Sequence, residues 1–507
     1  MAKITKQSEN FSKWYTDVIL DADLADYGPV KGTMVVKPYG FSLWTNIRNS
    51  LNQMIIDSGH ENAYFPLFIP KSFLEKEAKH VEGFAKECAV VTHSKLISKD
   101  GSLEVDPESQ LEEEIIVRPT SETIIWHMFK KWITSYRDLP LKVNQWANVV
   151  RWEMRTRLFL RTSEFLWQEG HTAHATKEEA MDETLLIVDI YKKLFEEYLA
   201  IPTVVGRKSN LERFAGADET FSIETMMRDK KALQAGTSHY LGTNFGSAFD
   251  VKFQNKDNKE LPVYATSWGV STRMVGALIM VHGDDKGLKI PPKIAPIQVI
   301  IIPINPRNEK QKEFTSFINR VNQDLSDLNV RTFIDEHSES PGFKFNKWEL
   351  KGVPIRIEIG LKEFENMEVT VCRRDNSEKQ QVLIDKIDEI PIILQNIQDS
   401  LFNDAKTFMD DNTCTVNTFA DFTETLSNDN QFIKAYWDGT DDTELQIKEK
   451  TKATIRCILE DNEDSSNKCI FSGQTAKHLA VFAKACLLYT SDAADDLLCV
   501  DLGGRRI

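Results

Sequence analysis

The 507-residue chain lacks several features that mark common classes of protein. Its seven cysteines show no CxxC spacing, which argues against a disulfide framework and favours reduced thiols. No apolar run approaches the roughly 20 residues that a membrane-spanning helix needs. The polar N-terminus, MAKITKQSEN, has no apolar segment of a secretory signal. We therefore expect a cytoplasmic protein that does not cross a membrane.

Two phosphate-binding loops are also missing. Neither GxxxxGK[ST] nor GxGxxG occurs, so a P-loop or a dinucleotide fold would not hold any bound ATP. The net charge of −15 does not suggest a general polyanion binder, although a local basic groove can bind RNA on an acidic protein. The length indicates about three domains.

The segment from 151 to 171, RWEMRTRLFLRTSEFLWQEGH, predicts a strand, a charged turn and a second strand. Alternate residues of a strand share a face, so Arg151 and Glu153 should point the same way. The second strand should present together Phe165, Trp167, Glu169 and His171. Such a face is unusual for a core and suits a nucleotide with a small charged substrate. The alternative is a structural salt-bridge patch on an exposed sheet.

Three further segments carry candidate binding residues. In IIVRPTSETIIW (115–126), Thr120 and Glu122 lie where a strand gives way to a helix that begins near Ser121. A favourable helix start would explain them equally well. Arg273 falls in the first turn of a helix, where backbone N–H groups favour an anion. LQAGTSHYLG places polar side chains in a glycine-rich setting, namely Gln234, Thr237 and His239.

The pattern changes after Pro296. Strands alternate there with helices, which indicates a compact α/β domain with a mixed or parallel sheet. A helix is expected from Pro391 to Phe402. The basic side chains of this domain are Lys344, Lys347, Lys351, Arg356, Arg373 and Arg374. The region 404–485 is acidic and weakly patterned, and the spacing of its cysteines is too irregular to indicate a zinc site.

Five segments occur in order: RPTSE (118–122), RWE (151–153), LRTSEFLWQEGH (160–171), QAGTSH (234–239) and SWGVSTR (267–273). Together they resemble prolyl-tRNA synthetase of the archaeal/eukaryotic type, a class II aminoacyl-tRNA synthetase. The resemblance implies an α+β catalytic domain at 1–290, built as an antiparallel sheet with flanking helices. An α/β anticodon-binding domain at 291–403 and a small α+β C-terminal domain at 404–485 would follow. ENAYFPLFIP (61–70) resembles motif 1, which implies a homodimer formed around Pro66.

The resemblance also implies an activity, which is that of a proline–tRNA ligase. Such an enzyme activates L-proline with ATP and Mg²⁺ and transfers it to the 3′ end of tRNA(Pro). Catalysis would fall to Arg151, Glu153 and Arg273. The proline pocket would comprise Thr120, Glu122, Arg151, Trp167, Glu169, His171, Phe214 and His239. ATP would contact Arg151, Arg161, Thr162, Phe165, Gln234, Thr237, Ser271 and Arg273. The anticodon would contact Lys344, Lys351 and Arg356, and Glu224 would bind Mg²⁺.

The sequence departs from the family pattern in places. Related enzymes often bind zinc through four cysteines of the C-terminal domain, whereas only Cys469 remains here, so no zinc is expected. The 172–266 interval leaves no room for an editing domain, so we expect some activation of alanine without proofreading. Residues 486–507 resemble a translated sequencing adapter, so we expect a non-native tail.

Two other classes of protein could share this sequence pattern. One is a catalytically inactive relative that binds RNA or a protein, and such relatives usually lose a motif arginine. The other is a sister class II enzyme for threonine, serine or glycine. The retained arginines argue against the first, and Thr120 and Glu122 with Trp167 and His171 favour proline over the second.

Overall fold

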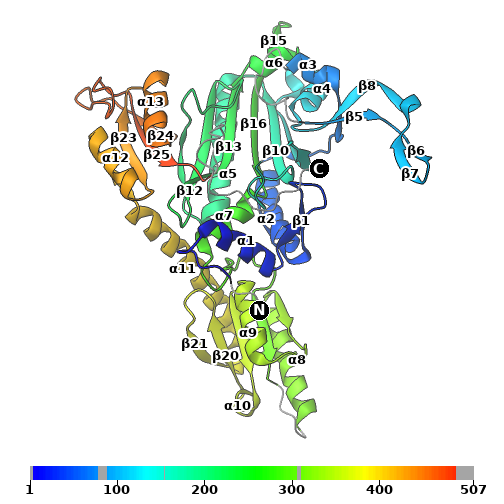
Figure 1. The fold of residues 1–507 in the computed structure, drawn as a ribbon, viewed down its shortest axis with the longest axis vertical. Helices are drawn as coiled ribbons and strands as arrows, with labels where there is room; N and C mark the ends of the chain where they lie inside the picture. The colour runs from blue at the N-terminus through cyan, green and yellow to red at the C-terminus, as the bar shows by residue number, and fades with distance from the viewer. Residues whose placement is uncertain (1–3, 78–87, 154, 305–309, 487–507) are drawn as a thin grey trace.

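The computed structural model describes residues 4–77, 88–153, 155–304 and 310–486. Three units are visible in Figure 1. A central unit carries a large sheet, a mixed-sheet unit lies below it, and a third unit lies to one side. The described part of the expected tail is limited to Cys486, and the rest of that expectation lies outside the described residues.

One eleven-stranded sheet runs through both the central and the third unit. Neighbouring strands in this sheet are antiparallel, except for the outermost pair at each edge, which is parallel. In spatial order the strands are β22 (Thr413–Thr415), β23 (Phe432–Trp437), β25 (His478–Lys484), β24 (Ala453–Asp461), β11 (Val204–Arg207), β12 (Glu219–Met226), β13 (Ala232–Gly242), β16 (Tyr264–Ser271), β10 (Glu164–His174), β9 (Leu141–Val150) and β3 (Glu61–Asn62).

Helices bury the apolar side of the central sheet. The largest core cluster joins Trp14, Leu43, Ile187 and Leu278, one from each of four helices. Those helices are α1 (Phe11–Asp21), α2 (Pro38–Asp57), α5 (Lys177–Lys193) and α7 (Arg273–His282). The remaining elements of this unit are β1 (Ala25–Tyr27), β2 (Met34–Val36), α4 (Glu122–Trp132), α6 (Asn244–Ala248), β14 (Lys252–Gln254), β15 (Glu260–Pro262), a π-helix (Leu194–Tyr198) and a 3₁₀ turn (Tyr136–Asp138).

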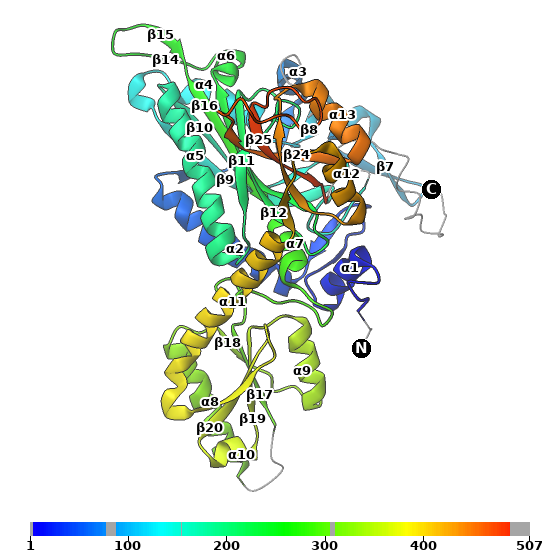
Figure 2. The same cartoon turned by 90° about the vertical axis from the view of Figure 1, so that its left-hand side faces the viewer.

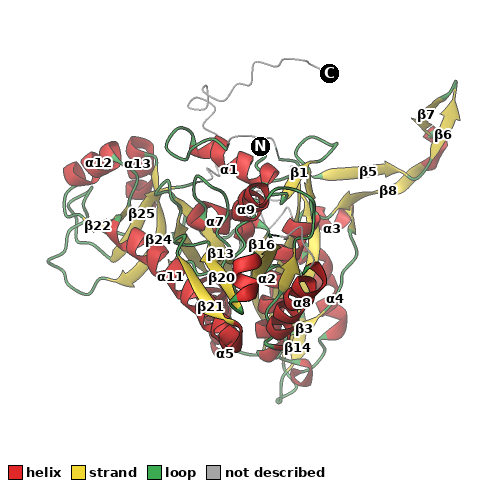
Figure 3. Ribbon diagram, turned by 90° about the horizontal axis from the view of Figure 1, so that it is seen from below, coloured by secondary structure: helices red, strands yellow, loops and turns green. Residues whose placement is uncertain are grey.

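An arm projects from the central unit, as Figure 3 shows from below. It begins with a three-stranded sheet of β4 (Phe68–Pro70), β8 (Gln110–Val117) and β5 (Ala89–His93). It ends in a hairpin of β6 (Leu96–Lys99) and β7 (Ser102–Val105). The segment also contains α3 (Lys71–Glu77) and a 3₁₀ turn (Pro107–Ser109). The Pro66 segment therefore forms two short strands, β3 and β4, separated at 63–67.

The lower unit has the mixed sheet that the sequence predicts. Its strands in spatial order are β18 (Thr332–Ile334), β17 (Val299–Pro303), β19 (Ile355–Ile359), β20 (Glu368–Arg373) and β21 (Lys379–Leu383). The first three are parallel and the last two antiparallel. Its helices are α8 (Gln311–Asp327), α9 (Pro341–Leu350), α10 (Leu361–Glu365), the 3₁₀ helix Ile384–Glu389 and α11 (Ile390–Asp411).

Two predicted boundaries need correction. Helix α11 does not end at Phe402 but continues to Asp411, because Leu401, Ala405 and Met409 extend one buried face at four-residue spacing. Figure 2 shows this helix rising from the lower unit towards the third, which also contains α12 (Phe419–Asn428) and α13 (Asp441–Thr451). The first hairpin strand ends at Val150, so Arg151 and Glu153 lie in the connection. None of the described helices is long and apolar enough to span a membrane.

Candidate active site

The strand register brings polar residues into two rows across the central sheet. One row runs from His171 on β10 through Ser267 on β16 and His239 on β13 to Thr220 on β12. The next row contains Glu169 and Thr237 on either side of Gly269. Because side chains at matched positions of neighbouring strands share a face, both rows open into one pocket of about 530 Å³.

Strand β10 keeps the alternation that the sequence predicts. Phe165, Trp167, Glu169 and His171 all line the pocket. Gly170 lies between the last two, and a Cβ there would come within 2.1 Å of the Trp268 indole on the adjacent strand. Glycine is therefore required for the packing that holds Glu169 and His171 in place.

A buried acidic group occupies one end of the pocket. Glu169 accepts a hydrogen bond from Gln145 Nε2 at 2.8 Å and lies 3.2 Å from His171 Nε2. Glu122, at the start of α4, is 8% exposed, and its Oε2 is buried without a hydrogen-bond partner within the described residues. His171 Nδ1 is buried and equally without a partner there. The unpartnered Glu122 oxygen suits a ligand that supplies an N–H donor.

The charges of this group are coupled. Burial raises the pKa of Glu122, and the nearby His171 partly opposes that shift. Burial alone would lower the pKa of His171, but the hydrogen bond that His171 donates to Glu169 and the charge of Glu122 outweigh it and raise the pKa. Two carboxyl groups and one imidazole therefore share this end, and a small cation bound there would favour the ionised carboxylates.

The opposite side of this end is neutral. The ring of Phe214 stacks on His239 with centroids 4.4 Å apart. Thr220 Oγ1 lies 3.0 Å from His239 Nδ1 and accepts a hydrogen bond from the Phe214 backbone N–H. Burial, reinforced by the charge of His171, lowers the pKa of His239 to about 3. His239 is therefore uncharged near neutral pH and offers an apolar surface with Phe214.

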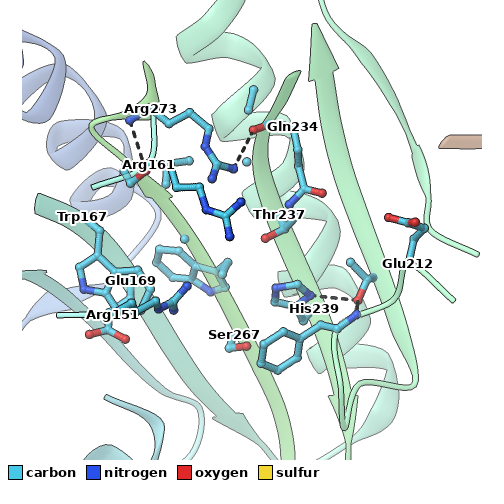
Figure 4. A pocket seen from close by; sticks show the side chains of 18 of the residues that line it. Arg151, Arg161, Trp167, Glu169, Glu212, Gln234, Thr237, His239, Ser267 and Arg273 are labelled. Carbon is cyan, nitrogen blue, oxygen red and sulfur yellow. Dashed lines mark hydrogen bonds between the residues drawn. The ribbon is translucent and has the colours of Figure 1, made fainter. Parts of the chain in front are cut away.

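Arginines line the other end of the pocket. Figure 4 shows Arg161 and Arg273 directing their guanidinium groups inward, with His239 and Ser267 further along. Arg161 Nε contacts a Glu153 carboxylate oxygen at 2.6 Å, so Glu153 orients this arginine. The Arg273 side chain lies against the carbonyl oxygens of Leu160 and Gln234 at 3.4 and 3.5 Å. Such planar donors suit phosphate oxygens.

Arg151 lies between the two ends. Its Nε donates to the Pro119 carbonyl at 3.0 Å, and its guanidinium lies 5.6 Å from the Phe165 ring centroid and 5.7 Å from that of Trp167. These contacts hold the cation beside both aromatic rings although the residue is not on a strand.

The structure brings nearly all the predicted pocket residues together. The lining contains Glu122, Arg151, Glu153, Arg161, Thr162, Phe165, Trp167, Glu169, His171, Phe214, Gln234, Thr237, His239, Ser271 and Arg273. Thr120 does not line it but is buried two residues before Glu122. Gln145 and Ser267 were missed, because their role depends on strand register and no local sequence pattern marks them.

Glu224 is placed differently from the prediction. It is fully buried outside the pocket lining, and Lys208 Nζ donates to one oxygen at 2.8 Å. Arg456 contacts the other oxygen through Nε and Nη2 at 3.0 and 2.8 Å. Burial raises the carboxyl pKa, but the two cations outweigh burial and lower it. Because both oxygens are committed to these cations, the assignment of Glu224 to Mg²⁺ is corrected to a structural ion triad.

The third unit supplies part of the pocket wall, which sequence reasoning missed. The contributing residues are Lys448, Thr454, Arg456 and Ala485. The loop 208–218, between β11 and β12, also contributes Leu211, Glu212, Arg213, Phe214 and Ala215. The two groups lie more than 200 positions apart in the chain, and the continuous sheet and helix α13 bring them together.

A second cavity of about 370 Å³ lies in the lower unit. Arg356 lines it, with its guanidinium 4.3 Å from the Phe345 ring centroid, and Lys379 lines it as well. Two other predicted anticodon residues have structural contacts instead. Lys344 is buried and donates to the Asp335 carbonyl at 2.7 Å. Lys351 lies 3.0 Å from Asp23 of the central unit.

The fold and pocket define a class II aminoacyl-tRNA synthetase. Residues 104–282 match the family model of the tRNA synthetase class II core domain (G, H, P, S and T), and residues 298–391 match that of the anticodon binding domain. Residues 419–485 match the model of the prolyl-tRNA synthetase C-terminal domain.

Comparison with individual proteins specifies the family. The chain is 53% identical to the proline–tRNA ligase of Flavobacterium johnsoniae over 487 residues, which cover 95% of this chain and 99% of that protein. It is 52% identical to those of Christiangramia forsetii and Bacteroides fragilis, again over 95% of the chain and over 99% and 98% of theirs. The chain therefore belongs to the proline–tRNA ligase family, whose members are ligases that form aminoacyl-tRNA.

Proposed function

We propose that this pocket joins L-proline to ATP as prolyl-adenylate and then passes the prolyl group to the 3′ end of tRNA(Pro). The observation that carries this proposal is the unpartnered, buried Glu122 Oε2 beside Glu169 and His171. The ammonium of proline has two N–H groups and a positive charge, which match the carboxylate oxygens at this end. The Phe214–His239 stack and Trp167 offer apolar surface to the ring methylenes.

Proline activation requires positioning more than proton transfer. The proline carboxylate is already ionised, so its oxygen attacks the α-phosphorus without a general base. The new O–P bond forms as the bond to the pyrophosphate leaving group breaks. Arg151, between the amino-acid and phosphate ends, contacts the carboxylate and α-phosphate and stabilises the developing charge.

ATP enters as its magnesium complex and occupies the arginine-lined end. Arg161 and Arg273 contact its phosphates, and Phe165 stacks on the adenine. Glu153 keeps Arg161 oriented through their 2.6 Å contact. Polar groups near these arginines complete the nucleotide site, namely Thr162, Gln234, Thr237 and Ser271.

The lower unit binds the anticodon through the Arg356 cavity. Bases of single-stranded RNA are held by stacking on aromatic rings and arginine planes, and the stacked Phe345–Arg356 pair provides both. Lys379 adds positive charge to the same cavity. Lys344 and Lys351 stabilise the fold and do not contact the anticodon, because Asp335 and Asp23 hold their ammonium groups.

We further propose a cytoplasmic homodimer whose third unit folds without zinc. Tyr64 and Phe68, either side of Pro66, are 73% and 50% exposed, and such large apolar side chains favour a partner surface. The six described cysteines are free thiols. Cys469 packs in the apolar core of the third unit, where a thiol behaves as a small hydrophobe. Analytical ultracentrifugation and metal analysis test these two points.

Amino-acid-dependent exchange between ATP and pyrophosphate tests the central proposal. Exchange that requires proline and is lost in Arg151→Ala would support it. Strong exchange with another amino acid would overturn the pocket assignment. No exchange with any amino acid, from protein that remains folded, would instead favour an inactive RNA-binding relative.

A further inference from the structure

The loop 208–218 joins the third unit to the amino-acid end of the pocket. One end of this loop begins at Lys208, whose ammonium is fixed in the buried triad with Glu224 and Arg456. Further along the loop is Phe214, whose ring stacks on His239. Contacts that fix the loop between these two residues therefore help to fix the position of the Phe214 ring.

Helix α13 of the third unit provides such support in the middle of the loop. Ser209 Oγ donates a hydrogen bond to Glu444 Oε1 at 2.7 Å, and both residues are buried. One turn further along α13, Lys448 Nζ lies 3.7 Å from a Glu212 carboxylate oxygen. Residues four apart share a helix face, so Glu444 and Lys448 contact the loop together.

The backbone at this junction allows close approach. A Cβ on Gly206, just before the loop, would come within 2.4 Å of the Ile458 carbonyl oxygen on β24. Glycine therefore permits β11 and β24 to lie side by side, with Arg207 paired in register to Ile458. The third unit is thus fixed against the loop from both a strand and a helix.

We propose that Glu444 and Lys448 of α13 are positioning residues that hold the loop 208–218 so that Phe214 closes the proline end of the pocket. The inference deepens the proposed function and rests on it. The third unit would thereby influence which amino acid binds, although Glu444 itself would not contact the substrate. Binding of proline should depend on this contact more strongly than binding of ATP, whose phosphates lie at the arginine end.

The chemistry of Glu444 makes the contact sensitive to pH. Its Oε2 is buried and has no hydrogen-bond partner within the described residues. Burial raises its pKa to about 7, with Glu212 and Asp441 adding to the shift and Ser209 and Lys448 opposing it. Ionisation above neutral pH therefore places a second negative charge against the Glu212-bearing loop and weakens the closure.

The test measures KM for proline and for ATP separately in the exchange reaction. Glu444→Ala should raise KM for proline about tenfold while KM for ATP and kcat stay within about twofold, the loss expected for a buried hydrogen bond. Ser209→Ala should have a similar effect, and the double variant should add little, because both remove one contact. Glu444→Gln keeps an acceptor for Ser209 and should restore KM.

Controls separate this role from general destabilisation. Glu449→Ala alters an exposed glutamate of the same helix and should leave both constants unchanged. If Glu444→Ala does not fold, Ser209→Ala and Glu444→Gln decide the matter. Equal rises in both KM values, or additive effects of Ser209→Ala and Glu444→Ala, would overturn the proposal. Wild-type enzyme without proline-dependent exchange would overturn the proposed function, whereas an active wild type with unaffected variants would overturn only the positioning role.

Discussion

Two buried glutamates near the central sheet, Glu224 and Glu122, have opposite environments. Glu224 is fully buried, and both its oxygens are held by Lys208 and Arg456. Glu122 is also buried, but its Oε2 has no hydrogen-bond partner within the described residues. Accordingly the pKa of Glu224 is lowered and that of Glu122 is raised. A buried charge that the protein satisfies is structural, and one that it leaves unsatisfied is available to a ligand.

The largest effect is expected at Glu224. Glu224→Ala leaves Lys208 and Arg456 buried without a counter-charge, so it should lower the free energy of unfolding by about 3–5 kcal/mol. Because the carboxyl pKa is lowered from 4.5, the stabilisation is present above that value and is lost as pH falls through the folded pKa. Denaturant unfolding at pH 7 and pH 4 measures both effects. An unchanged midpoint would contradict the structural assignment.

The environment of Glu444 is intermediate between those of Glu224 and Glu122, because only one of its carboxylate oxygens has a hydrogen-bond partner in the described part of the chain. Its folded pKa of about 7 exceeds the ordinary 4.5, so wild-type stability falls as pH rises between these values. Glu444→Gln should therefore increase the free energy of unfolding by roughly 2–3 kcal/mol at pH 8 and by much less at pH 5. Unfolding curves at the two pH values test this. Equal gains at both would show that the gain does not come from ionisation.

Glu122→Gln should weaken the binding of proline. The amide keeps the shape of the side chain but removes the charge that attracts the proline ammonium, so KM for proline should rise about tenfold or more. The wild-type affinity should increase as pH rises through the raised pKa of Glu122, and the variant should lack that dependence. KM for proline measured from pH 5.5 to 8.5 decides this, with Glu164→Gln on the exposed start of β10 as the matched control.

The smallest effect concerns the lower unit. Arg356→Met removes a stacked cation from the cavity and should weaken tRNA(Pro) binding about fivefold to tenfold. Lys351→Met should change that affinity by less than about twofold, because Asp23 of the central unit already holds the ammonium of this lysine. Filter binding with both variants compares the two. A larger loss for Lys351→Met would restore the original anticodon assignment.

The sequence allowed good predictions where a local pattern decides the structure. The two-residue alternation placed Phe165, Trp167, Glu169 and His171 on one face, and β10 confirms it. The alternating strands and helices after Pro296 likewise predicted the mixed sheet. Both features depend only on spacing along a few residues.

Local patterns could not identify contacts that arise between distant segments. Gln145 and Ser267 reach the site only through strand register, and Lys448 reaches it because α13 packs against the loop 208–218. Glu224 and Lys344 were assigned to ligands because a sequence reveals a charge without its partner. In each case the partner, Arg456 or Asp335, lies on another element and satisfies the charge internally.

Because the sheet is continuous, the third unit covers the edge of β11, which would otherwise be exposed. A chain that ended after α11 would leave the backbone groups at the edge of β11 unpaired. It would also leave Lys208 and Glu224 without their partner Arg456. Exposed strand edges recruit other chains and promote aggregation. The catalytic sheet and the C-terminal domain therefore form one structural unit, and a domain exchange at this boundary must carry β24 and α13 together.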